Sequence, residues 1–61
     1  MTKYAFIIST EDGVDQICET RGDANREAKD LRAMGCKVVV TVVPWDKQDA
    51  AVDRIESRCR P

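Results

Sequence analysis

The strongest constraint on this chain is a run of valine before a proline. Residues 36–43 read CKVVVTVV, with five valines in eight positions, and Pro44 follows. Branched side chains favour extended backbone, where they pack well on a pleated surface. Alternate positions form one wholly apolar face and one mixed face, which are Cys36, Val38, Val40, Val42 and Lys37, Val39, Thr41, Val43. We therefore expect a strand over 36–43 that ends at Pro44, because proline cannot donate to a ladder.

A second strand and a hairpin are expected near the N-terminus. Residues 3–10, KYAFIIST, are apolar on both alternating faces, which is typical of a central strand. Asp12-Gly13 follows, and this dipeptide between extended runs favours a hairpin turn. Residues 14–19 are short and polar, so we expect them to form an edge strand paired with the first.

Two helices complete the predicted order. Thr20 and Asp23 match a capping box, and Gly35 stands where a helix needs a left-handed residue at its C-terminus. The first helix has an apolar stripe of Ala24, Ala28, Leu31 and Met34. Asp46 is the expected N-cap of a second helix over 47–58. Its apolar stripe is Ala51, Val52, Ile55 and Cys59.

These elements predict an α+β fold in one small domain spanning residues 1–61. The order is β-β-α-β-α, and the three-stranded antiparallel sheet has the strand order 2-1-3. A right-handed crossover places the first helix on one face of the sheet. We expect the second helix to pack on the same face.

That arrangement would leave two apolar surfaces open. The strand over 36–43 would be an edge with Lys37 as its only charge, and such edges pair with other chains. The uncovered sheet face would also be apolar, and such areas mark interfaces. We therefore expect a homodimer, unless the second helix crosses over and leaves a monomer. The predicted interface residues are Val39, Thr41, Val43, Trp45 and Ile7.

Trp45 has two interpretations. It follows Pro44 at the end of the valine-rich strand, and tryptophan is enriched at binding hot spots. Alternatively, it packs over the start of the second helix as a hydrophobic staple. Both hold if the indole is half exposed.

The residue types present argue against catalysis. The chain has no His, which is the usual general base near neutral pH. Its three glycines are isolated and form no phosphate-binding loop. We therefore expect no catalytic site, no cofactor and no metal site.

The three cysteines are odd in number and form no C-x-x-C pair. We expect them to be buried and reduced, with a redox switch through Cys18, Cys36 or Cys59 as an alternative.

Charge and the absence of targeting signals limit the expected location and the classes of partner. No apolar stretch is long enough for a signal peptide or a membrane span, so we expect a cytoplasmic protein without a membrane partner. The net charge of -1 argues against tight nonspecific binding to nucleic acid.

We expect a small non-enzymatic interaction or regulatory module that binds another protein; an accessory role in a mobile element would fit such a chain. The alternative is a weak, sequence-tolerant nucleic-acid binder that uses Arg21, Arg26, Lys29 and Arg32.

Overall fold

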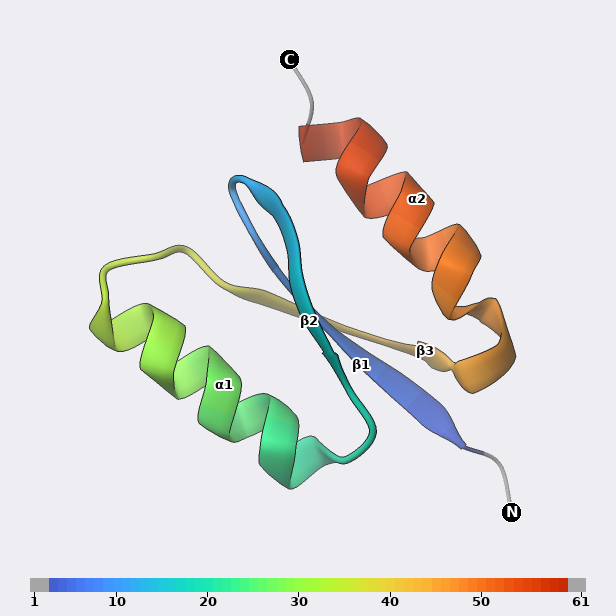
Figure 1. Ribbon diagram of the computed structural model, residues 1–61, viewed down its shortest axis with the longest axis horizontal. Coiled ribbons are helices and arrows are strands. Elements are labelled where there is room, and N and C mark those ends of the chain that lie inside the picture. The colour runs from blue at the N-terminus through green and yellow to red at the C-terminus, as the bar shows by residue number, and fades with distance from the viewer. Residues whose placement is uncertain (1–2, 60–61) are drawn as a thin grey trace.

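The computed structural model describes residues 3–59, with the side chain of Cys59 outside the description. The elements in chain order are β1 (Tyr4–Thr10), β2 (Gly13–Cys18), α1 (Arg21–Ala33), β3 (Val39–Pro44), a short 3-10 turn, η1 (Trp45–Lys47), and α2 (Gln48–Cys59) (Figure 1). The strands form an antiparallel sheet in the order β2-β1-β3. The predicted α+β fold, element order and strand order are therefore confirmed.

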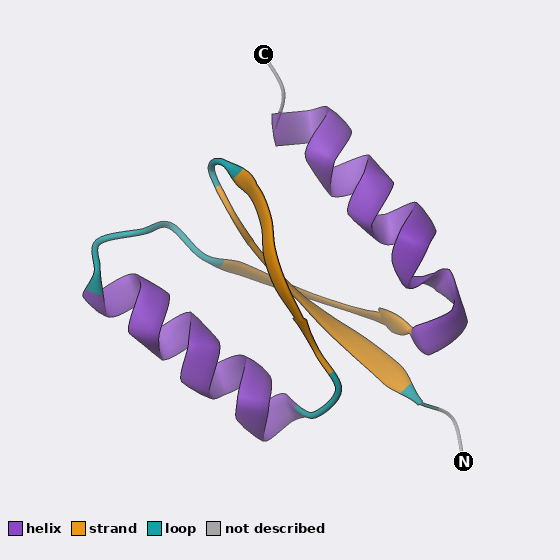
Figure 2. Cartoon of the chain, in the orientation of Figure 1, coloured by secondary structure: helices purple, strands orange, loops and turns teal. Residues whose placement is uncertain are grey.

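The two helices lie on opposite faces of the sheet. In Figure 2 the orange strands run diagonally between two purple helices, and α1 and α2 are separated by the sheet. Ile8 packs with Ala24 and Leu31 of α1, whereas its neighbour Ile7 points to the other face and is also 0 % exposed. The expectation that both helices pack on one face is therefore wrong.

Alternation along β1 explains why a second helix is needed. Ala5 and Ile7 share one face of β1 and Phe6 and Ile8 share the other, because successive side chains of a strand point to opposite sides. Both faces are apolar, so a single covered face would leave Ile7 in water. Burying a side chain of that size stabilises the fold by about 1.5 to 3 kcal/mol. α2 provides that burial by packing across β2, β1 and β3.

Strand β2 is irregular at one point. It pairs with β1 in register from Phe6 opposite Cys18 to Ile8 opposite Gln16, and a bulge between Ile8 and Ser9 shifts the register. Ser9 therefore pairs with Val14, and Asp15 is the additional residue. A bulge bends an edge strand and interrupts its row of backbone groups, so β2 is poorly shaped to accept another strand.

Both ends of α1 are capped. The Thr20 hydroxyl accepts a hydrogen bond from the Asp23 backbone N–H at 3.3 Å, as the capping pattern predicts. At the other end, the N–H of Gly35 donates to the Arg32 carbonyl and the N–H of Cys36 donates to the Leu31 carbonyl. This pair of bonds is a Schellman motif. It requires the positive φ of +89° that Gly35 adopts.

The later element boundaries differ from the predicted ones. Strand β3 begins at Val39 rather than Cys36, because the Cys36 backbone N–H is used to close α1. Asp46 is not the N-cap of α2; it lies within the 3-10 turn that precedes the helix. No helix within residues 3–59 is long and apolar enough to span a membrane.

Candidate functional site

Strand β3 is an open edge of the sheet. In the part of the chain that the structure describes, β3 pairs with β1 on one side and with no strand on the other. The Trp45 backbone N–H donates to the Lys3 carbonyl at 2.9 Å, and this bond fixes which pairs in the ladder exchange hydrogen bonds. Hydrogen-bonded pairs alternate with non-hydrogen-bonded pairs along an antiparallel ladder. Counting from Trp45, the backbone groups of Val43 and Thr41 therefore bond to β1. The backbone N–H and C=O groups of Val40 and Val42 therefore point outward.

Proline sits at one end of this outward row. Pro44 pairs with Tyr4 and has the same orientation as Val40 and Val42. The backbone N–H at this position would point away from β1. Its absence in proline therefore removes no hydrogen bond to β1, which explains why proline is tolerated in the strand. The open edge thus offers donors at Val40 and Val42 and a final carbonyl at Pro44.

A groove runs between β3 and α1. It has a volume of about 280 Å³ and is lined by Phe6, Arg21, Ala24, Asn25, Val40 and Val42. Val42 is 49 % exposed although it belongs to the apolar face of β3. The small Ala24 brings α1 close to the sheet and leaves this apolar floor accessible. The groove ends in the polar side chains of Arg21 and Asn25.

A second groove runs along the opposite face of the same strand. It has a volume of about 170 Å³ and is lined by Val43, Pro44, Lys47, Ala50, Ala51 and Arg54. Ala50 and Ala51 leave room beside Val43 because their side chains are short. The two grooves flank one strand, so alternate side chains of a chain paired with β3 would enter one groove and then the other.

The predicted interface residues divide into accessible and inaccessible ones. Val39 is 60 % exposed, while Thr41, Val43 and Trp45 are half-buried on or beside β3. Ile7 is fully buried and contacts no solvent. Its assignment to an interface is corrected because α2 covers the sheet face on which it lies. The open-face argument for a homodimer is removed for the same reason.

Trp45 is anchored by the N-terminal end of β1. The Lys3 ammonium lies 4.4 Å from the centroid of the Trp45 ring, and it also lies 3.5 Å from a Glu19 carboxylate oxygen. These contacts tie the ends of β1, β2 and β3 together. The half-buried indole therefore has a structural role, and its exposed part borders the end of the β3 edge.

Charge is segregated across the two sheet edges. In α1, Arg21 and Asn25 line the β3 groove, and Arg32 follows Asn25 by two turns on that flank. Lys47 of η1 and Arg54 of α2 line the other β3 groove, and Arg58 follows Arg54 by one turn. We call this set the basic rim: Arg21, Arg32, Lys47, Arg54 and Arg58. All five side chains are exposed.

The acidic side chains of both helices lie on the opposite flanks, toward β2. Asp23 and Glu27 line a groove of about 360 Å³ with Cys18 and Glu19 of the β2 end. Asp30 continues that flank of α1, and helical periodicity places Asp49, Asp53 and Glu56 on the equivalent flank of α2. Apart from Asp46, which follows β3 in η1, and Arg26, which lines the groove beside β2, the charges of the two helices and η1 are basic toward β3 and acidic toward β2, although the net charge is only -1.

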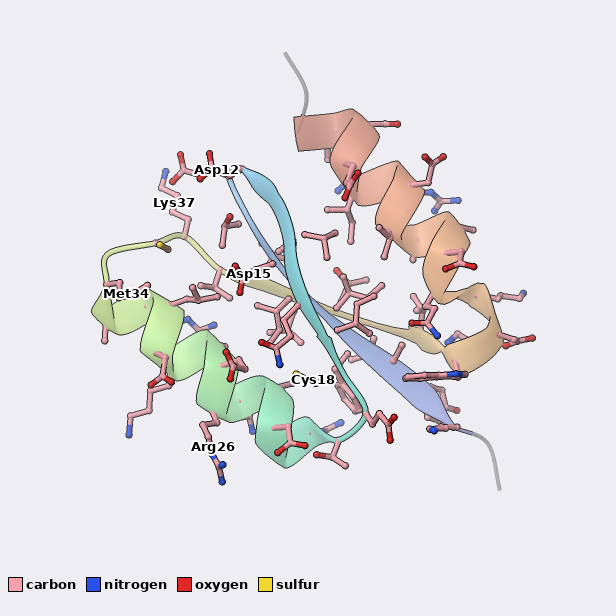
Figure 3. All side chains as sticks on the ribbon, in the orientation of Figure 1. Asp12, Asp15, Cys18, Arg26, Met34 and Lys37 are labelled. Atoms are coloured by element: carbon pink, nitrogen blue, oxygen red, sulfur yellow. The ribbon has the colours of Figure 1, made fainter. Side chains whose placement is uncertain are left out.

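The predicted nucleic-acid residues do not form one patch. Arg21 and Arg32 belong to the basic rim, whereas Arg26 lines the acidic groove beside β2. Figure 3 shows Arg26 directed away from the sheet. Lys29 is exposed on the outer surface of α1. The structure thus separates the four cations that the sequence grouped together.

The described cysteine thiols are free, and Cys18 lies in the core. Cys18 is 4 % exposed and belongs to the cluster with Ile8, Ala24 and Leu31, as expected of a buried thiol. Burial raises the pKa of the Cys18 thiol, and the carboxylates of Asp23 and Glu27 raise it further. A thiol needs a lowered pKa to act as a nucleophile near neutral pH, so this environment suppresses reactivity. Cys36 is half-buried, and the predicted role of the Cys59 side chain lies outside the described residues.

Sequence reasoning missed several residues that shape the β3 edge. It selected Val39, Thr41 and Val43, whereas the outward backbone groups belong to Val40 and Val42. It also left Asn25, Lys47 and Arg54 unassigned, although they line the grooves. A usable signal was present for α2, because Ala50, Ala51 and Arg54 share one flank at helical spacing.

No protein-family model, curated protein sequence or solved structure matches this chain. The function is therefore inferred from β3 and its two grooves.

Proposed function

We propose that this protein is a non-enzymatic interaction module that binds another protein along the open edge of β3. The observation that carries the proposal is the pair of grooves on either side of a strand whose outward backbone groups are unpaired. Exposed edges of this kind template the addition of a strand from another chain. Recognition by strand addition combines main-chain hydrogen bonds with pockets for alternate side chains, and β3 offers both.

The partner strand would bond to Val40 and Val42. Its alternate side chains would contact Phe6 and Val42 on the α1 side, and Val43 and Ala51 on the α2 side. The apolar floors of the grooves supply buried area, and the backbone bonds set the register. Trp45 would border the end of the added strand, which is consistent with an indole that remains half-buried in the free protein.

A homodimer through the same edge is the second use of β3 that the apolar strand suggests. A two-fold axis between two β3 strands would place each α1 beside its copy and each α2 beside its copy. The basic rim of one copy would then face the basic rim of the other. Because like charges opposed across an interface weaken association, we favour a different protein as the partner.

Two matched variants test this function. Val42→Pro removes an outward N–H without removing a bond to β1, and Val42→Thr keeps both the N–H and the branched shape. Each protein, tagged and recovered gently from a lysate of its own cells, is examined by native mass spectrometry. We expect the parent and Val42→Thr to carry a stoichiometric protein partner and Val42→Pro to lose it. A partner retained by a folded Val42→Pro variant would contradict the proposal, as would a parent that carries no protein.

A further inference from the structure

We infer that the chain bound along β3 is an extended segment of a partner protein. This segment carries acidic side chains where it passes from the two grooves to the basic rim. This inference rests on the proposed function and specifies the chemistry of the partner. It follows from the charges around the edge rather than from the edge alone. The segment would alternate apolar residues over the groove floors with Asp or Glu at the basic rim.

Cations lie at both grooves beside β3. Arg21 lines the groove on the α1 face, and Arg54 and Lys47 line the groove on the α2 face. Helices from opposite faces of the sheet thus present positive charge to the same strand. An acidic segment paired with β3 would meet a cation on either side of it.

The charges of the basic rim are not neutralised within the described part of the chain. Within residues 3–59, the one ion pair is between Lys3 and Glu19, and no member of the basic rim has an acidic partner. The acidic side chains of α1 and α2 lie toward β2. Positive charge that is not paired internally is available for carboxylates, and opposite potentials accelerate the encounter of two proteins.

The same charges argue against a second copy as the occupant. Two β3 edges would oppose their basic rims. A head-to-tail contact of β3 with the acidic β2 edge would match in charge, but the bulge at Asp15 interrupts that edge. Such a contact would also leave one open edge at each end and continue into a filament.

Nucleic acid fits the edge less well than an acidic peptide. Single-stranded nucleic acid is held by a cationic track with aromatic side chains on which bases stack. Here the groove floors are largely aliphatic, and Arg26 points away from the sheet (Figure 3). The outward amide and carbonyl groups of Val40 and Val42 instead match the repeat of a peptide backbone.

The experiment is a selection of random ten-residue peptides displayed on phage, with the full-length protein immobilised as bait. We expect the recovered peptides to alternate apolar and other residues and to be enriched in Asp and Glu. Synthetic copies of the strongest binder are then titrated against variants of the protein. Recovery of peptides that depend on β3 but lack acidic residues would overturn this inference and leave the proposed function standing.

Charge-reversed variants provide the matched comparison. Arg21→Glu and Arg54→Glu place a carboxylate at the β3 grooves, whereas Arg26→Glu makes the same change on α1 away from them. We expect the first two to weaken peptide binding at least tenfold and Arg26→Glu to change it less than threefold. Circular dichroism confirms that each variant is folded. Equal losses for Arg21→Glu and Arg26→Glu would overturn the role of the basic rim.

Other outcomes would overturn the proposed function together with the acidic-segment inference. Peptides whose binding is unaffected by Val42→Pro, or a selection without enrichment, would overturn both the acidic-segment inference and the proposed function. Tighter binding of a single-stranded oligonucleotide than of any recovered peptide would overturn both in favour of nucleic acid. Concentration-dependent dimerisation that excludes the peptide would assign the edge to a second copy.

Discussion

The ammonium group of Lys3 lies 4.4 Å from the centroid of the Trp45 ring. Lys3 directly precedes β1, and Trp45 directly follows β3. The same ammonium is 3.5 Å from a Glu19 carboxylate oxygen beyond the end of β2. One side chain therefore links the three strands at one end of the sheet. It also holds the indole beside the last residue of the open edge.

Replacing Lys3 tests this link. Lys3→Gln removes the cation, and we expect the free energy of unfolding to fall by about 1 kcal/mol, the sum of an exposed cation–π contact and an exposed ion pair. Lys3→Arg keeps both interactions and should be nearly neutral, while Glu19→Gln removes only the ion pair and should cost less. Urea denaturation followed by Trp45 fluorescence measures all three. Equal losses in Lys3→Arg and Lys3→Gln would show that the charge is irrelevant.

Ile7 provides a test of the two-faced core. It is 0 % exposed on the face that α2 covers, so Ile7→Ala should lower the free energy of unfolding by about 2 to 5 kcal/mol. Val39→Ala is the control, because Val39 is 60 % exposed on the same face, and it should change stability by about 0.5 kcal/mol or less. Chemical denaturation compares the two variants. Similar small effects would mean that α2 does not cover Ile7.

The raised pKa of the Cys18 thiol predicts that the protein loses stability at alkaline pH. Burial, Asp23 and Glu27 raise its pKa above the ordinary value of 9.0, so the folded protein keeps the proton to a higher pH than the unfolded chain. This stabilising contribution is complete below the unfolded pKa and is lost as the pH rises through the folded pKa.

Comparison with Cys18→Ala isolates that effect, since the other cysteines are common to both proteins. The free energy of unfolding should decline more steeply in the parent than in the variant as the pH rises past the ordinary thiol pKa of 9.0, and the two proteins should behave alike near neutral pH. Parallel declines would contradict a raised pKa at Cys18.

Gly35 and Gly22 should respond in opposite directions to alanine. Gly35 has a φ of +89° in the Schellman motif, so Gly35→Ala should cost about 1 kcal/mol of left-handed backbone strain. Gly22 lies in the first turn of α1 with no atom within 4 Å of an added Cβ, so Gly22→Ala should stabilise the protein by about 0.5 to 1 kcal/mol. Thermal unfolding of both variants provides the measurement. A destabilised Gly22→Ala with a neutral Gly35→Ala would contradict this account of α1.

Local sequence signals predicted the elements well because local physics sets them. The turn at Asp12-Gly13, the Thr20 cap and the left-handed Gly35 each depend on residues close in the chain. The strand order 2-1-3 followed from the apolar faces of β1 and from chain connectivity. The hairpin bulge at Asp15 left no such signal, since it depends on how two strands pair.

The side of the sheet that α2 covers could not be predicted from local patterns. Ala51, Val52 and Ile55 form an apolar stripe that would fit either face. The choice depends on the path of the 3-10 turn after Pro44 and on the need to bury Ile7. Because this choice was missed, the sequence placed Ile7 at an interface and overlooked the groove beside Val43.

Association with itself is a further measurable consequence of the charge pattern. If opposed basic rims prevent pairing of two β3 edges, the protein should be a monomer at low salt in analytical ultracentrifugation. Reversing every charge of the basic rim in one sample, with Arg21→Glu, Arg32→Glu, Lys47→Glu, Arg54→Glu and Arg58→Glu combined, and mixing it with the parent should promote association through β3, because the opposed rims then attract. A stable dimer of the parent at low salt would contradict this prediction.

Residue-resolved amide hydrogen exchange shows whether β3 is the edge that binds the partner. In the free protein, the amides of Val40 and Val42 should exchange rapidly and those of Thr41 and Val43 slowly, since only the latter bond to β1. Addition of the acidic peptide recovered by selection should slow exchange at Val40 and Val42 by about tenfold or more. Unchanged exchange at both of these amides in the presence of bound peptide would contradict strand addition to β3.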